Sequence, residues 1–345
     1  MSITNTQAVS SYTDAIANLP EDAFLGSLLY FSISQADVNL ANARRDLKAA
    51  GLDITGLRKN LRPVDAFRKA TKEFEKRFPV HHNVRSELMV RSVGDDGQQA
   101  YRHLILERAE FKTGRKRRVF YEKVGELTFT RGVKKNGEYQ DHGVEARRTT
   151  GHLTTSLTEE EDQWLTERLV TFKDRYDHLL RYMDSHAVRT FVREAIYNLS
   201  GTCVKESGGL YFVKQEHAAE IAKLQTWVKG VGSEFHSLPL LNLADQRAMI
   251  MEAFEDEAIK EVERLMGEVS KILLDPGRQI EEKTFDSYAL RAAELTAKVK
   301  EYNQMLGSRA DRAATEINIY SQQVLSLTSR IRESKTTTAK VIPSA

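Results

Sequence analysis

The chain has 345 residues, of which 29% are charged and 41% are hydrophobic, with 6 prolines and a net charge of +2. This composition is typical of a folded, helix-rich protein and excludes a disordered chain. Cys203 is the single cysteine, which excludes an intrachain disulfide and a zinc site built from several cysteines. Apolar runs fall short of the roughly 20 residues that span a bilayer, and residues 1–11 lack the features of a secretory signal, so we expect a cytoplasmic location and no membrane partner.

The first regular element is expected after a polar stretch, residues 1–20, which we predict to be a flexible arm. Phe24–Ile33 combines aromatic and aliphatic residues and predicts a strand. Gln35–Ala50 then places apolar residues at 4-3-4-3 spacing, which predicts a helix that ends at Gly51. A second amphipathic helix is expected over Val64–Phe78.

The apolar pattern between His81 and Arg148 has a period of two, which is typical of strands with one buried face. Asp95-Asp96-Gly97, Thr113-Gly114 and Asn136-Gly137 are turn sequences of the hairpin type. We therefore expect an antiparallel meander, which the Phe24–Ile33 strand could join. The predicted strands are Asn83–Val93, Ala100–Phe111, Arg117–Lys123 and Glu126–Gly132.

Helical periodicity returns at Thr158, where Glu161 three residues later completes a capping-box sequence. The apolar seam behind this start runs from Leu165 to Met183. A further helix, two short strands, another helix and a strand are expected after it. They are His186–Leu199, Thr202–Lys205, Leu210–Val213, Glu216–Lys229 and Glu234–Leu238.

The last hundred residues carry the strongest pattern in the chain, a heptad-like spacing of apolar residues. One series runs over Met251–Ile272 and a second over Tyr288–Ile331, with a one-residue phase slip near Gly307. Asp275-Pro276-Gly277 lies between them and predicts a turn. We therefore expect two helices folded back on each other, the second of them, Glu281–Glu333, on the order of 80 Å long.

Together these elements predict an α+β protein, with a small helix-plus-antiparallel-sheet body followed by a long C-terminal α-helical coiled-coil-like hairpin. The expected segments are a flexible arm at 1–20, an α+β domain with a basic antiparallel sheet at 21–150, a helical segment with a small helix-hairpin-helix-strand unit at 151–243, the helical hairpin at 244–333 and a disordered tail at 334–345.

Motifs for catalysis or for a cofactor are absent from the sequence. The chain lacks GxxxxGK[ST], GxGxxG after a strand, GxSxG and HExxH, so no cofactor is expected. His81 and His82 would point to opposite faces of a strand, so we expect no metal site there. The acidic run Glu255–Glu257 is interpreted as a solvated helix face. An enzyme with a site assembled from distant residues stays open as a third alternative, without an identified catalytic residue.

A basic excess is confined to residues 35–150, which carry a net charge of +10, against −3 for residues 1–34 and −5 for residues 151–345. Its densest part is a predicted hairpin flanked by Phe111, Phe120 and Tyr121. Basic side chains neutralise phosphates and aromatic rings stack on bases, so the pattern favours a polyanion such as nucleic acid. The alternative is that the aromatic residues face the core and the basic residues solvate a loop. The candidate residues are Lys112, Arg115, Lys116, Arg117, Arg118, Arg131, Lys134 and Lys135.

The segment TFVREAIYNLSGTCVKESGGLYFVKQEHAAEI resembles an uncharacterised family found in bacteria and bacteriophages. The resemblance covers mainly Thr190–Leu240. It implies a prokaryotic or phage setting, and it assigns no activity, cofactor or functional residue to the chain.

We predict a non-enzymatic interaction or assembly protein that self-associates, or docks a protein partner, through its C-terminal helical hairpin. The second helix of that hairpin is longer than the first and would leave part of its seam uncovered, so we expect a homo-oligomer. The alternative is a nucleic-acid-binding protein that uses the basic hairpin. The expected self-association seam is Leu295, Val299, Tyr302, Leu306, Ile317, Tyr320, Val324 and Leu327.

Overall fold

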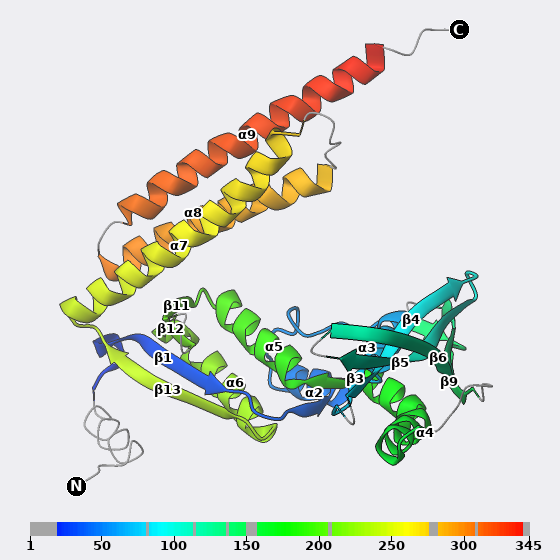
Figure 1. The fold of residues 1–345 in the computed structure, drawn as a ribbon. Coiled ribbons are helices and arrows are strands. Elements are labelled where there is room, and N and C mark those ends of the chain that lie inside the picture. The colour runs from blue at the N-terminus through cyan, green and yellow to red at the C-terminus, as the bar shows by residue number, and fades with distance from the viewer. Residues whose placement is uncertain are drawn as a thin grey trace. The chain divides into compact units, whose positions relative to one another are not determined.

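The computed structural model describes residues 19–80, 83–112, 115–135, 138–149, 157–205, 209–275, 282–307 and 310–340. It combines helices with antiparallel strands, so the α+β class is confirmed (Figure 1). The chain forms two compact units, each discontinuous in sequence. The meander unit comprises Gln35–Ala49 and Ile54–Val188, and the bundle unit comprises Met1–Ser34, Ala50–Asp53 and Arg189–Ala345.

The meander unit contains a five-stranded antiparallel sheet with the order β3-β4-β5-β6-β9, as the alternating pattern predicts. The two strands predicted on either side of Val124 are one continuous strand, because the register shift at Leu104 accommodates Val124 as an extra residue. A Cβ on Gly125 would lie 2.9 Å from Leu104 Cδ1 and 3.1 Å from the Arg147 carbonyl oxygen, so the bulge leaves little room for a side chain. The strands are β3 (Lys76–Arg77), β4 (Val84–Asp95), β5 (Gln99–Lys112), β6 (Arg115–Thr130) and β9 (Gly143–Arg148).

Two helices, α3 (Pro63–Lys72) and α4 (Glu159–Arg181), share a hydrophobic core with this sheet. Phe67 of α3 stacks on Phe129 of β6, and Phe172 of α4 lies edge-on to Phe67. The predicted start of α4 is confirmed, since Thr158 and Glu161 form a reciprocal capping box. The smaller elements of the unit are β2 (Asp37–Asn39), α2 (Leu40–Ala49), β7 (Val133–Lys135), β8 (Glu138–Gln140) and β10 (Tyr182–Asp184), with β2 paired to β10 and β7 to β8.

The bundle unit contains a second antiparallel sheet with the order β11-β12-β1-β13. β1 pairs with strands far along the chain, so the expectation that it could join the meander is wrong. A Cβ on Gly26 would lie 2.2 Å from the Val213 carbonyl oxygen, so glycine is needed for this pairing. In the same unit, Phe191 and Trp227 meet edge-on, 5.3 Å apart. The elements are η1 (Glu21–Ala23), β1 (Phe24–Ser32), α5 (Ser185–Asn198, in this unit from Arg189), β11 (Thr202–Lys205), β12 (Leu210–Lys214), η2 (Gln215–His217), α6 (Ala218–Gly230) and β13 (Glu234–Leu241).

Three helices follow β13 and run side by side: α7 (Ala244–Leu273), α8 (Glu282–Leu306) and α9 (Asp311–Lys340) (Figure 1). The single long helix predicted over Glu281–Glu333 is wrong, because α8 ends at Leu306 and α9 runs back along it from Asp311 (Figure 1). Gly307 has a φ of +65°, and Asn303 Oδ1 accepts a hydrogen bond from the Ala310 backbone N–H at 2.7 Å. Of the turn predicted after α7, Pro276 and Gly277 lie outside the described residues.

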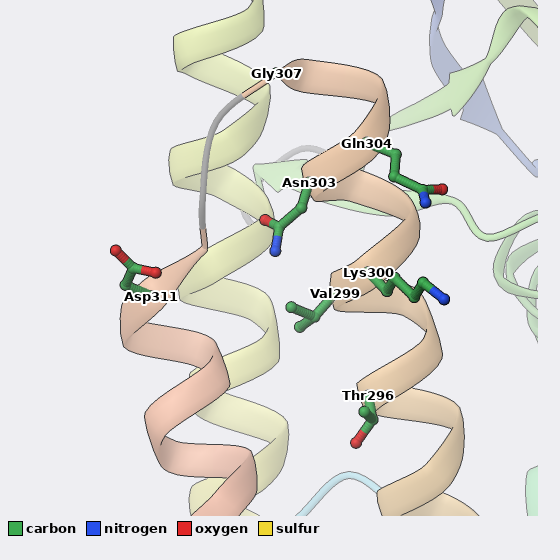
Figure 2. A pocket seen from close by; sticks show the side chains of 7 residues that line it. All are labelled: Thr296, Val299, Lys300, Asn303, Gln304, Gly307 and Asp311. Atoms are coloured by element: carbon green, nitrogen blue, oxygen red, sulfur yellow. The ribbon is translucent and has the colours of Figure 1, made fainter.

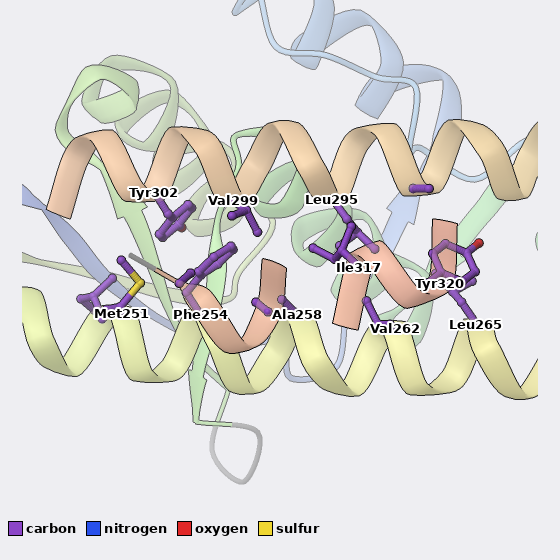
Figure 3. Packing of buried hydrophobic residues seen from close by; sticks show 14 of the residues in the cluster. Met251, Phe254, Ala258, Val262, Leu265, Leu295, Val299, Tyr302, Ile317 and Tyr320 are labelled. Carbon is purple, nitrogen blue, oxygen red and sulfur yellow. The ribbon is translucent and has the colours of Figure 1, made fainter. Parts of the chain in front are cut away.

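Each helix of this bundle contributes one apolar face to a common core (Figure 3). Phe254 of α7 stacks on Tyr302 of α8 with 4.2 Å between ring centroids. Tyr320 of α9 donates from its hydroxyl to the Tyr288 carbonyl oxygen of α8 at 3.1 Å. The heptad pattern therefore marks the buried faces correctly, and a third helix takes the place of a two-helix hairpin.

Candidate functional site

The first group of predicted basic residues surrounds the turn between β5 and β6. Lys112 pairs with Arg115 at the end of the two strands, which confirms the hairpin. Arg118 is exposed. The side chains of the other four residues of this group lie outside the described part of the structure: Lys112, Arg115, Lys116 and Arg117.

The second group of predicted basic residues lies beyond the other end of β6. Arg131 forms an ion pair with Asp95, and hydrogen bonds from Gly97 and Arg131 lower the pKa of the Asp95 carboxyl. Lys134 lies 5.9 Å from the Tyr139 ring centroid, and Lys135 is exposed. β6 has 16 residues and is therefore about 50 Å long. The two basic groups therefore lie at opposite ends of β6, and polyanion binding by either stays a prediction.

The apolar residues that follow Arg118 on β6 are exposed, not buried. The exposed fractions are 37% for Val119, 55% for Phe120 and 62% for Tyr121. The alternative that these aromatic residues face the core is therefore wrong for Phe120 and Tyr121. Phe111 is partly buried, with the Arg85 guanidinium 4.8 Å from its ring centroid. One strand thus presents three neighbouring apolar side chains to solvent.

Among the described strands, these three residues lie on an open edge of the sheet. β6 pairs with β5 along its whole length, whereas β9 pairs with β6 over Gly125–Thr130 (Figure 1). No strand in the described part of the chain pairs with the outer side of residues 115–123 of β6. An edge strand has unpaired backbone N–H and C=O groups that can bind another extended chain. We call residues 115–123 the open edge of β6.

Two acidic residues of β6, Glu122 in the open edge and Glu126 just beyond it, differ in their partners. Glu126 accepts a hydrogen bond from Lys123 Nζ at 2.6 Å, which lowers the pKa of its carboxyl. Glu122 lies opposite Leu106 and has a buried Oε1 atom without a hydrogen-bond partner among the described residues. A buried carboxylate oxygen without a donor is costly, so a cation supplied at this edge would stabilise it.

The residues of the predicted self-association seam pack within the core of a single protomer. Tyr302 and Tyr320 are fully buried in the three-helix core. The side chain of Leu327 lies outside the described residues. The other seam residues are also buried, with exposed fractions between 3% and 7%: Leu295, Val299, Leu306, Ile317 and Val324.

A largely buried polar cluster connects the helical bundle to the backbone at the start of β11. Lys298 Nζ donates to the Gly201 carbonyl oxygen at 2.9 Å and lies 3.6 Å from Glu257 Oε2. Thr202 donates to the hydroxyl of Tyr302 at 2.8 Å, and Tyr302 donates to the Ser200 carbonyl oxygen at 2.8 Å. Sequence reasoning missed this cluster, since periodicity carries no information about contacts between residues about one hundred positions apart.

Burial changes the acid strength of three groups in this cluster. Desolvation raises the pKa of Glu257 and of Tyr302, and it lowers the pKa of Lys298. The Glu257 side chain is 22% exposed, so the interpretation of Glu255–Glu257 as a solvated face is wrong for Glu257. The polar groups contact one another and the backbone just before β11. This arrangement is typical of a structural contact that fixes α8 against the sheet of the bundle unit.

A hollow of about 550 Å³ lies along α8 and the start of α9 (Figure 2). Figure 2 shows the charged side chains of Lys300 and Asp311 pointing away from each other. The lining groups therefore do not converge as ligand-binding groups do. The lining residues are Thr296, Val299, Lys300, Asn303, Gln304, Gly307 and Asp311.

The residues that the structure describes hold neither a cluster of metal ligands nor a membrane-spanning helix. In that part of the chain, no three histidine, cysteine, aspartate or glutamate side chains gather in a way that could hold a metal ion. None of its helices combines the length and the apolar character needed to cross a bilayer.

Comparison with known proteins identifies a family for nearly the whole chain. No curated protein and no solved structure matches it. One family model, described as a family of unknown function (DUF6744), matches residues 24–334 and thus includes every described strand and most of α9. The chain therefore belongs to this uncharacterised family, DUF6744.

Proposed function

We propose that the chain is a non-enzymatic interaction protein that binds an extended segment of a partner along the open edge of β6. The observation that carries this proposal is the exposure of Val119, Phe120 and Tyr121 on a strand half without a described outer neighbour. In strand addition, backbone hydrogen bonds supply affinity and alternate side chains supply specificity. The helical bundle is not proposed as the binding surface, because its apolar faces pack against one another.

The two faces of the open edge offer different contacts to an added strand. Phe120 lies opposite Arg108, on the sheet face that carries the buried Leu106. Val119 and Tyr121 lie opposite Ala109 and Glu107, on the other face. Proteins usually protect edge strands with charges, bulges or short length, and three consecutive exposed apolar residues depart from that pattern. An added strand would cover apolar surface on both faces.

Photo-crosslinking tests this function. The crosslinking amino acid p-benzoylphenylalanine replaces Tyr121 in cells that naturally make the protein. A control variant carries it in place of Tyr139, which is 40% exposed on β8. We expect a discrete adduct from position 121 and none from position 139. The absence of an adduct at position 121 above the control level would contradict the proposed function.

Nucleic-acid binding is a second candidate, because the exposed rings of Phe120 and Tyr121 follow the exposed Arg118 on the same strand. Solvent-exposed aromatic residues beside a basic run suit stacking on single-stranded bases. If this function holds, binding should weaken by about one log unit per log unit of salt for each phosphate neutralised. Absence of binding to single- or double-stranded DNA and RNA at about 50 mM salt would contradict it, since this attraction is strong there.

A further inference from the structure

We infer that the occupant of the open edge is a second copy of the same edge, so that two protomers pair antiparallel through β6 about a two-fold axis at Phe120. The inference rests on the proposed function and names its partner. A two-fold interface brings one surface patch against itself, so the patch must be complementary to its own inverted copy. The side chains of β6 meet that condition in one register.

In this register Phe120 lies opposite Phe120 of the second copy, and Val119 lies opposite Tyr121. Arg118 lies opposite Glu122, and the symmetry repeats each of the last two pairs. Aromatic pairs, aromatic pairs with β-branched residues and opposite charges are the cross-strand pairs that stabilise antiparallel sheets. The apolar residues that are exposed in the protomer would thus be covered together.

The pairing also supplies a cation to Glu122. Its Oε1 atom is buried and has no hydrogen-bond partner in the described part of the protomer. Arg118, Phe120 and Glu122 alternate along β6, so their side chains lie on the same face of the sheet. An arginine directly opposite in an added strand could donate to this carboxylate, because facing Cβ atoms are about 4.5–5.5 Å apart. The second copy would therefore supply a donor to the Glu122 oxygen that has none among the described residues of the protomer.

Other symmetric registers are less favourable. An axis at Arg118 or at Glu122 sets like charges opposite each other, which destabilises a sheet. An axis at Val119 or at Tyr121 sets Phe120 opposite a charged residue. The register at Phe120 does place Arg117 opposite Lys123, but the Lys123 ammonium already binds Glu126 within its own chain at 2.6 Å.

The test is the mass of the full-length protein in solution, measured by sedimentation at tens of micromolar. We expect twice the chain mass of 39.2 kDa. Phe120→Asp should raise the dissociation constant by at least about 100-fold, because it places two carboxylates at the axis. Val133→Asp is the matched control, since Val133 is also exposed (58%) on a strand of the meander unit, and it should leave the mass unchanged. Circular dichroism checks that both variants are folded.

A charge exchange tests the register independently of folding. Arg118→Glu and Glu122→Arg should each weaken the dimer by about tenfold, and the double variant should restore it, because the exchanged pair is again complementary. A dimer that survives Phe120→Asp, or one that the double variant fails to restore, would overturn the inference.

The second copy and the proposed function can fail separately. If the wild-type protein is a monomer and position 121 crosslinks to a different protein, the inference of a second copy is refuted and the proposed function still holds. A monomer without any crosslink overturns both. A monomer that binds nucleic acid in a way that Phe120→Asp abolishes assigns the edge to the nucleic-acid alternative and also overturns the inference.

Discussion

Lys298 belongs to the polar cluster that connects α8 to β11. The substitution Lys298→Met should lower the free energy of unfolding of the bundle unit by about 3 kcal/mol. Lys298 Nζ lies 3.6 Å from Glu257 Oε2, a distance at which two unit charges attract by about 4–5 kcal/mol at an effective dielectric constant of about 20. Removing one partner of a buried pair leaves the other charge desolvated, which costs about 3–5 kcal/mol. Both side chains are 22% exposed, so we expect the lower end of that range.

The double variant Glu257→Gln/Lys298→Met should be within about 1 kcal/mol of the wild type, because removing both ions also removes both desolvation costs. Burial raises the pKa of Glu257 above 4.5 and lowers the pKa of Lys298 below 10.5, so each ion is less favourable in the folded state than in the unfolded chain. The stability contributed by protonated Glu257 is present below pH 4.5 and is lost as the pH rises through its folded pKa. Any increase in the free energy of unfolding of the double variant, relative to the wild type, should therefore be larger near neutral pH than in acid.

Urea unfolding followed by tryptophan fluorescence measures these effects. The chain has two tryptophans, and a Trp164→Phe background leaves Trp227 of the bundle unit as the reporter. The single variants and the double variant then form a double-mutant cycle. A cost below about 1 kcal/mol for Lys298→Met, or a double variant that loses the sum of the two single losses, would refute a coupled buried pair.

Two further predictions concern packing and hydrogen bonding. Tyr302→Phe should destabilise the bundle unit by about 2 kcal/mol in the same urea assay, since the Tyr302 hydroxyl makes two hydrogen bonds. Tyr320→Phe should cost about 1 kcal/mol, because the Tyr320 hydroxyl makes one. Equal costs would contradict this assignment. Gly125→Ala should lower the melting temperature of the meander unit, because the added Cβ would crowd Leu104 and the Arg147 carbonyl. Gly143→Ala should have a smaller effect, because no atom of the described residues beyond its chain neighbours lies within 4 Å of the position of its Cβ. The reverse order would contradict the bulge geometry.

Local signals predicted local structure well. Alternation of apolar residues predicts β4, β5 and the two halves of β6, and the Thr158 capping box marks the first turn of α4. The heptad spacing marks the buried faces of α7, α8 and α9 correctly. It cannot specify how many helices meet, because one apolar face suits a partner in a two-helix hairpin and in a three-helix bundle. The phase slip and Gly307, which has a positive φ, are sequence features at the position where the chain reverses.

Long-range features could not be predicted in the same way. The pairing of β1 with β12 and β13 depends on a close backbone approach at Gly26 and leaves no periodic signal. Phe120 and Tyr121 resemble core residues of a strand in the sequence. Among the described strands only β9 pairs with the outer side of β6, and it does so over Gly125–Thr130 and does not reach Phe120 or Tyr121. The candidate surface therefore depends on how long a neighbouring strand is, a property that aromatic content does not encode.

Hydrogen exchange of the intact protein at two concentrations tests the central claim most directly. Pairing through the open edge predicts that a peptide covering residues 115–124 exchanges more slowly in the concentrated sample, because edge amides gain hydrogen bonds to the second copy. Phe120→Asp should abolish this difference. Peptides from α8 should exchange at the same rate in both samples. Concentration-dependent protection of α8, with none over residues 115–124, would contradict the account and assign self-association to the helical bundle.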